Sequence, residues 1–351
     1  MKAQKLMSIG LIVAFSIISC KKGTNPGKVI QQVPDIYLAG NTTSAYVVGS
    51  TTNTYTVATY WKNGILTHLT HDSTNASANA IIFNGSDMYV AGFTTTATTT
   101  ATYWKNGKAT YLNGGNFFAS YANSIAVQGN DVYVAGYALT LNGNQSHEFA
   151  TYWKNGTPVT LPSGADITSI AVQGDDVYVA GFSYNSGNSV ATYWKNGKAV
   201  SLTDGTSDAY AFAILLNGPD IYVAGGINNL ATYWKNGVVV TLGANGLNPV
   251  SAYAIAVQGA DIYMAGTINT LNAAQFHFPT SFIYWKNGVA GKTFGNISPS
   301  TFSLSCAMAL NGNDVYIAEN GESAGYWKNG NLINITSDST AYFNAIAVVP
   351  H

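Results

Sequence analysis

Short runs of alternating apolar and polar residues, separated by brief stretches rich in Gly, Asn, Ser and Thr, fill the chain from residue 35 to its end. Alternation with a period of two is typical of half-buried β-strands, and nothing in this region has helical spacing. One representative stretch contains four such runs in succession, at residues 124–129, 130–136, 150–154 and 157–161. The hydrophobic pattern therefore predicts an all-β structure.

A unit of four strands recurs along the chain. The string YWKNG occurs seven times and contains all seven tryptophans, which lie 40 to 51 residues apart. A second string, DVYVAG or a close variant, also occurs seven times. A third, a small residue followed by an aliphatic run, is centred on Ile82, Ile125, Ile170, Ile214, Ile255, Met308 and Ile346. A period of this length with four short strands per unit is typical of β-propeller blades.

Turn chemistry and strand order complete the predicted fold. Asn-Gly between two strands favours a type I′ hairpin, because both central residues need positive φ. The first unit begins at Asp35 with a second strand, whereas residues 344–349 form a first strand with nothing after it. We therefore predict a seven-bladed β-propeller of four-stranded antiparallel blades over residues 35–351, closed by the C-terminal strand completing the first blade. Alternatively, residues 45–49 are the first unit's second strand, but residues 35–40 fit the repeat at every position.

Residues that are identical in every blade are expected to be scaffold. Strand alternation places Tyr and Trp of each YWKNG on opposite faces, so the Trp and Val faces should pack between blades; a ring of ligand-stacking aromatics is the alternative. The Asp that starts each second strand should meet the Lys that ends each third strand, giving register control rather than an acidic, cation-binding rim. The predicted pairs are Asp35–Lys62, Asp87–Lys105, Asp131–Lys154, Asp176–Lys195, Asp220–Lys235, Asp261–Lys286 and Asp314–Lys328.

The connections that vary between units should all emerge at the rim opposite the tight turns. A rigid scaffold with variable loops is a common way to build a binding surface. Aromatic rings among neutral hydrogen-bonding residues suit a sugar or a protein partner, although many such rings could simply seal loops onto the blades. The candidate ligand-binding residues are Phe118, Tyr121, Tyr137, His147, Phe149, Tyr184, Tyr210, Phe276, His277, Phe278 and Phe302.

Composition limits the possible chemistry. All 15 basic residues are lysines, against 16 acidic residues, which argues against a nucleic-acid ligand. Two cysteines cannot form a disulfide framework, and Cys306 is expected to be a packed thiol. The sequence contains no strong catalytic or phosphate-binding motif.

A few residues are of types found in catalytic or metal sites, but their positions give little support for such a role. Glu148, Glu319 and Glu322 are the only glutamates, and isolated loop carboxylates are mostly solvated. The spacing of His68 and His71 points their rings to opposite faces of a strand, which disfavours a metal site. We therefore predict no cofactor, no metal and no catalytic residue.

The N-terminus has the features of an export signal. A basic start at residues 1–5 precedes an apolar run at residues 6–18 that is too short for a permanent membrane span. Residues 17–20 (IISC) resemble the bacterial lipoprotein cleavage box, which implies lipidation at Cys20. The predicted organisation is a signal peptide at 1–19, a lipidated Cys20 with a flexible tether at 20–34, and the propeller at 35–351; a soluble secreted protein is the alternative.

The repeated strings resemble HAF-type extracellular repeats, in which an aromatic-Trp-x-Asn-Gly hairpin alternates with an Asn/Gly turn and a Val-Val-Gly-like strand. The counterparts here are TYWKNG and QGNDVYVAG, although the spacing and the strict Asp and Lys differ. The resemblance implies an extracellular β-repeat without an established activity.

Together these patterns predict a monomeric, non-catalytic binding or interaction scaffold. It would be lipid-anchored to a bacterial membrane, with the outer membrane as the expected one, and its ligand would be a glycan or a protein. A propeller hydrolase or lyase acting on polysaccharide, and a purely structural surface protein, are the alternatives.

Overall fold

The chain divides into two units, Met1–Val33 and Pro34–His351. The computed structural model describes residues 33–351 except 49–50, 72–74, 144, 163–164, 186, 244–247, 270–280, 296–305, 320–324, 337 and 339. The predicted signal peptide and Cys20 lie outside the described residues. Among the residues that are described, no helix has the length and apolarity needed to cross a membrane.

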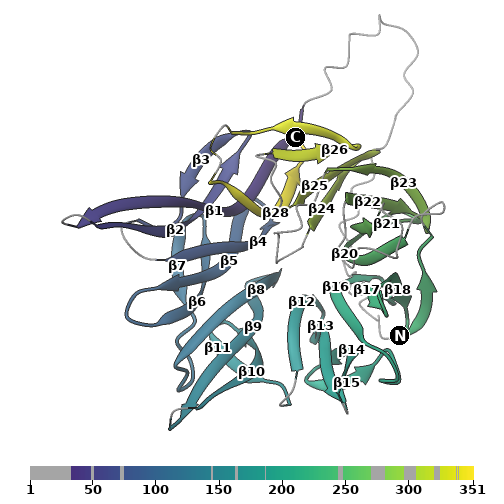
Figure 1. Ribbon diagram of the computed structural model, residues 1–351, viewed down its shortest axis with the longest axis horizontal. Helices are drawn as coiled ribbons and strands as arrows, with labels where there is room; N and C mark the ends of the chain where they lie inside the picture. Colours follow the sequence, from purple (N-terminus) through teal and green to yellow (C-terminus); the bar gives the residue numbers. More distant parts are fainter. Residues whose placement is uncertain are drawn as a thin grey trace, which may run out of the picture. The chain divides into compact units, whose positions relative to one another are not determined.

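Seven four-stranded antiparallel sheets form a β-propeller, as predicted (Figure 1). From the inner to the outer strand, blade 1 contains β28 (Tyr342–Val349), β1 (Asp35–Val48), β2 (Thr51–Lys62) and β3 (Ile65–His68). Blade 2 contains β4 (Ala76–Asn84), β5 (Asp87–Thr95), β6 (Thr99–Lys105) and β7 (Lys108–Tyr111). Blade 3 contains β8 (Ala119–Gln128), β9 (Asp131–Asn142), β10 (Gln145–Lys154) and β11 (Thr157–Thr160).

The remaining blades follow the same order. Blade 4 contains β12 (Ala165–Gln173), β13 (Asp176–Asn185), β14 (Asn188–Lys195) and β15 (Lys198–Ser201), and blade 5 contains β16 (Ala209–Asn217), β17 (Asp220–Ile227), β18 (Leu230–Lys235) and β19 (Val238–Thr241). Blade 6 contains β20 (Asn248–Gln258), β21 (Asp261–Asn269), β22 (Ser281–Lys286) and β23 (Val289–Phe294). Blade 7 contains β24 (Cys306–Asn311), β25 (Asp314–Glu319), β26 (Gly325–Lys328) and β27 (Asn331–Asn334).

The C-terminal strand closes the ring by completing blade 1. β28 pairs with β1 along its length, from Asp35 opposite Val349 to Asn41 opposite Tyr342. At the same seam, His351 Nε2 lies 3.6 Å from Asp35 Oδ1. The alternative that made residues 45–49 a separate second strand is wrong, because β1 runs without interruption through residues 45–48 as one long strand paired with β2.

Each interface between blades packs two different faces together. Between blades 3 and 4, Tyr133, Ala135 and Tyr152 lie against Val179 and Trp194. The other six interfaces contain equivalent clusters, and six of the seven tryptophans are at most 1% exposed. The prediction that the Trp and Val faces pack between blades is therefore confirmed.

A β-bulge on the inner strand explains a glycine that recurs in the second strand. In six blades the register of the inner strand shifts by one residue, and the shift brings a backbone carbonyl over the neighbouring strand. A Cβ on Gly136, for example, would overlap the carbonyl oxygen of Tyr121. Blade 7 pairs Cys306 with Glu319 without a shift, and a glutamate occupies the glycine position there.

Bulged residues also connect neighbouring blades. The Nδ2 of Asn79 donates to the carbonyl of Ala122 in the next blade at 2.8 Å. Equivalent bonds run from Asn344 to Ala78, from Asn123 to Ile167 and from Thr168 to Ala211, at 2.9–3.1 Å. In blades 5 and 6 this position holds Phe212 and Tyr253, whose rings contact each other. One part of the inner ring is therefore hydrogen-bonded and another is aromatic.

The tight-turn rim repeats one polar cluster in every blade. In blade 4, Lys195 Nζ lies 2.6 Å from Asp176 Oδ2 and 5.1 Å from the ring centroid of Tyr178. Asn196 has φ of 50°, donates to Asp176 Oδ1 at 2.7 Å and accepts from the backbone N–H of Val177 at 2.8 Å. The Lys195 ammonium and the Asn196 amide hold the pKa of the Asp176 carboxyl below its usual value. This Asn therefore closes the I′ turn and fixes the Asp.

All seven predicted Asp–Lys pairs are formed, with Nζ to Oδ2 distances of 2.6–3.3 Å. The lysine in each pair is exposed, so the pairs are weak sources of stability and act mainly on register and solubility. The repeated Asp, Asn, Lys and Tyr of each unit thus form one cluster, which fixes the strand register at this rim.

Candidate functional site

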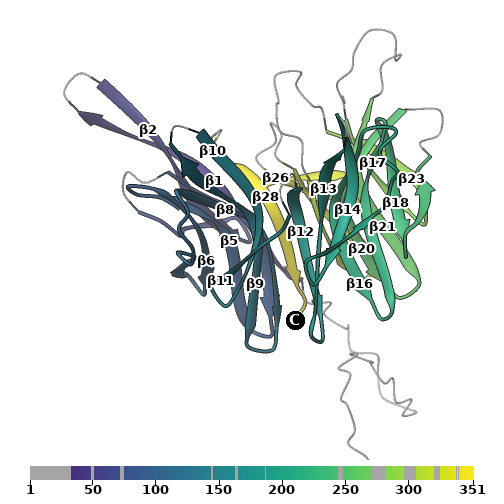
Figure 2. The same ribbon diagram turned by 90° about the horizontal axis from the view of Figure 1, so that it is seen from below.

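The two rims of the propeller differ in sequence and in shape. Tight turns join the first strand to the second and the third to the fourth at one rim, so the variable connections emerge at the other, here called the variable rim. Hairpin length varies most at the variable rim: β1 and β2 pair as far as Val48 and Thr51, whereas β17 and β18 end at Ile227 and Leu230. Figure 2 shows the β1–β2 hairpin projecting well beyond the other strands.

Eight aromatic side chains, here called the aromatic row, lie on the inner strands and their neighbours in blades 2 to 6. Phe93 contacts Tyr121, which stacks on Tyr137 with ring centroids 4.7 Å apart. A second group continues from Tyr184 and Phe182 through Tyr210 and Phe212 to Tyr253, with centroid separations of 4.8–5.9 Å. Tyr184 is 60% exposed and the others are half-buried, so the row offers ring surface to a ligand.

The structure brings four predicted ligand-binding residues into this row: Tyr121, Tyr137, Tyr184 and Tyr210. They were expected in loops, but all four belong to strands, because the antiparallel pairing continues further towards the variable rim than the repeat indicates. The same correction applies to His147 and Phe149, which lie in β10.

The other predicted residues are not part of the row. His147 is exposed, Phe149 is half-buried, and Phe118 is 51% exposed between β7 and β8. Phe276, His277, Phe278 and Phe302 lie outside the described residues.

Two carboxyl groups lie where the row is interrupted, between blades 3 and 4. The Tyr184 hydroxyl donates to Asp166 Oδ2 at 3.0 Å. Burial raises the pKa of the Glu148 carboxyl, and the charge of Asp166 and a hydrogen bond to it raise it further. Burial, followed by the charges of Tyr121 and these two carboxyl groups, raises the pKa of Tyr137 to about 12. This site therefore favours the neutral forms of Glu148 and Tyr137.

The remaining candidates for chemistry do not gather into a site. His68 Nδ1 lies 3.0 Å from Thr59 Oγ1, and Cys306 is 6% exposed within the core cluster between blades 6 and 7. The side chain of Glu319 and the whole of Glu322 lie outside the described residues. Within the described ranges, no three His, Cys, Asp or Glu side chains come together as a metal-binding group.

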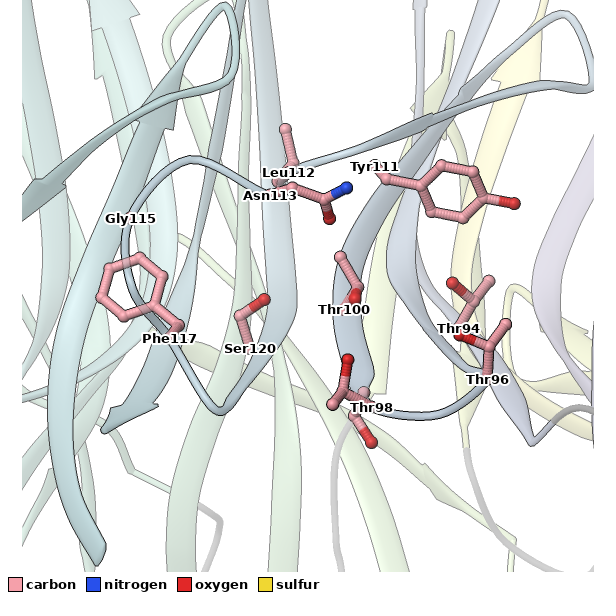
Figure 3. Close-up of a pocket in the computed structure, with 11 residues that line it drawn as sticks. Thr94, Thr96, Thr98, Thr100, Tyr111, Leu112, Asn113, Gly115, Phe117 and Ser120 are labelled. Atoms are coloured by element: carbon pink, nitrogen blue, oxygen red, sulfur yellow. The ribbon is translucent and has the colours of Figure 1, made fainter. Parts of the chain in front are cut away.

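A groove of about 540 Å³ opens beside the row in blade 2 (Figure 3). Its lining comes from the β5–β6 hairpin, the end of β7, the segment leading into β8 and the start of β8. Figure 3 shows the rings of Tyr111 and Phe117 on opposite sides, with Thr98, Thr100 and Ser120 between them. We call it the threonine groove; it is lined by Thr94, Thr96, Thr98, Thr99, Thr100, Tyr111, Leu112, Asn113, Gly115, Phe117 and Ser120.

Sequence reasoning missed several members of these sites. Phe93 and Phe182 directly follow the Ala-Gly of the repeated second strand, where a packing role was the simpler interpretation. Asp166 is one of 13 aspartates and carries no motif. The run TTTATTT at residues 94–100 was a visible signal, although the corresponding connection of the first unit also holds a hydroxyl-rich run, STTNTYT at residues 50–56.

Comparisons with known proteins bear on the fold alone. No protein-family model and no curated protein matches the chain. Among solved structures, the chain is similar to the acylaminoacyl peptidase of Pyrococcus horikoshii, with a TM-score of 0.50 and 12% identity over 89% of this chain and 53% of that one. It also matches apo AztD from Citrobacter koseri, with a TM-score of 0.45 and 9% identity over 90% of this chain and 99% of that one.

A third match is the computationally designed Ika8 protein, with a TM-score of 0.40 and 14% identity over 87% of this chain and 96% of that one. At such identities the chemistry of one protein does not transfer to another. What the fold itself supports is a rigid scaffold for binding or interaction, with the variable rim as the part that differs from blade to blade.

Proposed function

We propose that this protein is a non-catalytic binding module of the bacterial cell envelope that holds a glycan on its variable rim. The single observation behind this proposal is the difference between the side chains at the two rims. One rim repeats the same Asp, Asn, Lys and Tyr cluster seven times, whereas the other concentrates unlike aromatic and hydroxyl side chains. Aromatic faces beside neutral hydrogen-bonding groups suit the apolar and hydroxylated surfaces of a sugar ring.

The test is binding of the full-length protein, in mild detergent, to a glycan array, followed by calorimetry on the best ligand. Tyr184→Ala removes an exposed ring of the row, whereas Lys195→Ala alters the opposite rim of the same blade. We expect Tyr184→Ala to weaken binding by about tenfold, the order of one lost aromatic contact, and Lys195→Ala to leave it unchanged. A blank array together with a stoichiometric protein partner from the envelope would replace the glycan with a protein ligand.

A second function is favoured by one observation, the Glu148–Asp166 pair, which supplies two carboxyl groups beside the proposed ligand surface. A hydrolase or lyase acting on polysaccharide would need such groups. Retaining glycosidases hold theirs about 5 Å apart and inverting ones further apart, on either side of the bond that is cleaved. Release of reducing ends from a bound glycan, abolished by Glu148→Gln, would favour the enzyme.

The proposal includes attachment to the membrane through a lipidated Cys20, with an export signal before it. The support is the order of a basic start, a short apolar run and a small residue before the cysteine. Several acyl chains anchor a protein stably where a single one does not. We expect the wild type to fractionate with membranes and to incorporate labelled palmitate, and Cys20→Ser to lose both properties.

A further inference from the structure

Blade 2 departs from its neighbours at the positions that form the threonine groove. The last residue of its outer strand is Tyr111, where the same register position holds Thr160 in blade 3, Ser201 in blade 4 and Thr241 in blade 5. Tyr111 is 53% exposed, so packing of the fold does not account for the large ring. The position varies, since it holds His68 in blade 1 and Asn334 in blade 7, and an exposed ring that lines a cavity there points to a local ligand.

The polar groups of the groove fall into two classes. Those at its base are already paired: Thr94 Oγ1 lies 3.0 Å from Thr102 Oγ1, and Ser120 Oγ accepts from the backbone N–H of Ala101 at 2.9 Å. Among the described residues, the hydroxyls of Thr96, Thr98 and Thr100 and the amide of Asn113 have no protein hydrogen-bond partner. The base is therefore rigid, and the walls keep donors and acceptors for a ligand.

The lining is neutral throughout, because none of the eleven residues carries a charge. A carboxylate or ammonium group placed there would lose water without gaining a counter-charge, which is costly. Hydroxyls and an amide both donate and accept, as the hydroxyl pairs of a sugar do. The groove therefore selects for uncharged polyhydroxyl ligands.

Shape supports the same conclusion. The rings of Tyr111 and Phe117 lie on opposite sides of the groove (Figure 3), and its volume of about 540 Å³ lies within the range of about 300–1,000 Å³ usual for small-ligand sites. The second and third strands of blade 2 have 9 and 7 residues, whereas those of blade 1 have 14 and 12, and those of blade 3 have 12 and 10. The groove thus belongs to a short blade between two long ones.

We propose that the threonine groove is a subsite for a neutral sugar residue and that it rejects charged sugars. This inference rests on the proposed function, since it names where the glycan binds and which glycans are accepted. Tyr111 supplies the ring against which the sugar packs, and Thr98, Thr100 and Asn113 supply hydrogen bonds. The groove rejects charged sugars because its lining offers no counter-charge, and not because it carries a charge that repels them.

The experiment is calorimetry of the full-length protein with two matched pairs of oligosaccharides. Chitin hexaose carries neutral acetamido groups where chitosan hexaose carries ammonium groups, and mannohexaose carries neutral hydroxymethyl groups where the mannuronate hexamer carries carboxylates. We expect the neutral member that binds to do so at least tenfold more tightly than its charged counterpart. Equal or tighter binding of the charged member would overturn the inference.

Variants locate the binding. Tyr111→Ala and Asn113→Ala should each weaken binding of the neutral hexaose by about tenfold, while Tyr111→Phe keeps the ring and most of the affinity. Thr160→Ala changes the same register position in blade 3 and should bind as the wild type does. Unchanged melting temperatures establish that Tyr111→Ala is folded, as expected for an exposed side chain.

The two proposals fail differently. If a neutral hexaose binds and is lost in Tyr184→Ala but not in Tyr111→Ala or Asn113→Ala, the glycan function stands and the groove is not its subsite. If neither pair binds and the glycan array is blank, both proposals fall together.

Discussion

Replacing Phe343 by alanine tests the closure of the ring on which the two rims depend. Phe343 is 1% exposed in β28 and meets Trp61 edge to face, with centroids 4.7 Å apart. A buried phenylalanine covers about 150–250 Å², equivalent to about 4–6 kcal/mol at ~25 cal/mol per Å². Because alanine keeps part of that burial, Phe343→Ala should lower the free energy of unfolding by about 3–5 kcal/mol.

Urea denaturation followed by tryptophan fluorescence, together with calorimetry, measures this loss. At roughly 2 °C per kcal/mol for a domain of this size, the melting temperature should fall by about 6–10 °C. Tyr342→Ala is the matched control, because the neighbouring side chain is 51% exposed and should cost only about 0.5 kcal/mol. If both variants melt within about 2 °C of the wild type, β28 does not complete blade 1 and the ring is open.

Three further changes probe single features of the fold. Gly136→Ala forces a Cβ against a backbone carbonyl, so it should lower the free energy of unfolding, measured by urea denaturation, by about 1–3 kcal/mol. Glu319→Ala changes the same position in blade 7, which has no bulge, and should lower it by less than about 1 kcal/mol. Asn155→Ala removes two turn hydrogen bonds and a residue tolerant of positive φ, and should cost about 1–3 kcal/mol by the same measurement. Glu148 has a raised pKa, so its contribution to stability is present below the ordinary glutamate pKa and is lost as pH rises through the raised value. Glu148→Gln should therefore melt above the wild type at pH 7 and level with it at pH 4; the opposite order would contradict the placement of Asp166 beside it.

The fold followed from the sequence because its determinants repeat. A single Asn-Gly is a modest hairpin signal, but seven of them at matching offsets from seven Trp and seven Asp fix strand order, register and blade count together. The ion pairs followed from register alone, since antiparallel neighbours place the start of one strand beside the end of the other. The β-bulge did not follow from the sequence, because a glycine in a strand also suits several other roles.

The candidate site was less predictable, because its members do not repeat. Tyr121 and Tyr137 belong to the continuation of paired strands, where alternation fades and the sequence looks like a loop. Asp166 and Glu148 come from different blades, so their proximity depends on how the blades are set around the axis. The threonine run also carried a local signal, but its meaning depends on Tyr111, which follows it by eleven residues.

The invariance of one rim is what allows the other to diverge. In every blade, the Asn-Gly turn and its Asp–Lys pair fix the alignment of the strands at the tight-turn end, and the Trp and Val faces lock that end to the next blade. The far ends of the strands are then free to stop after a two-residue turn, as β17 and β18 do, or to extend to Val48 and Thr51. The tight-turn end also prevents register errors at the variable rim, because a slip by one residue would turn every buried Trp outward. Replacement of side chains such as Tyr111 therefore costs the fold little, which is the physical condition for a binding site to evolve in one blade of seven.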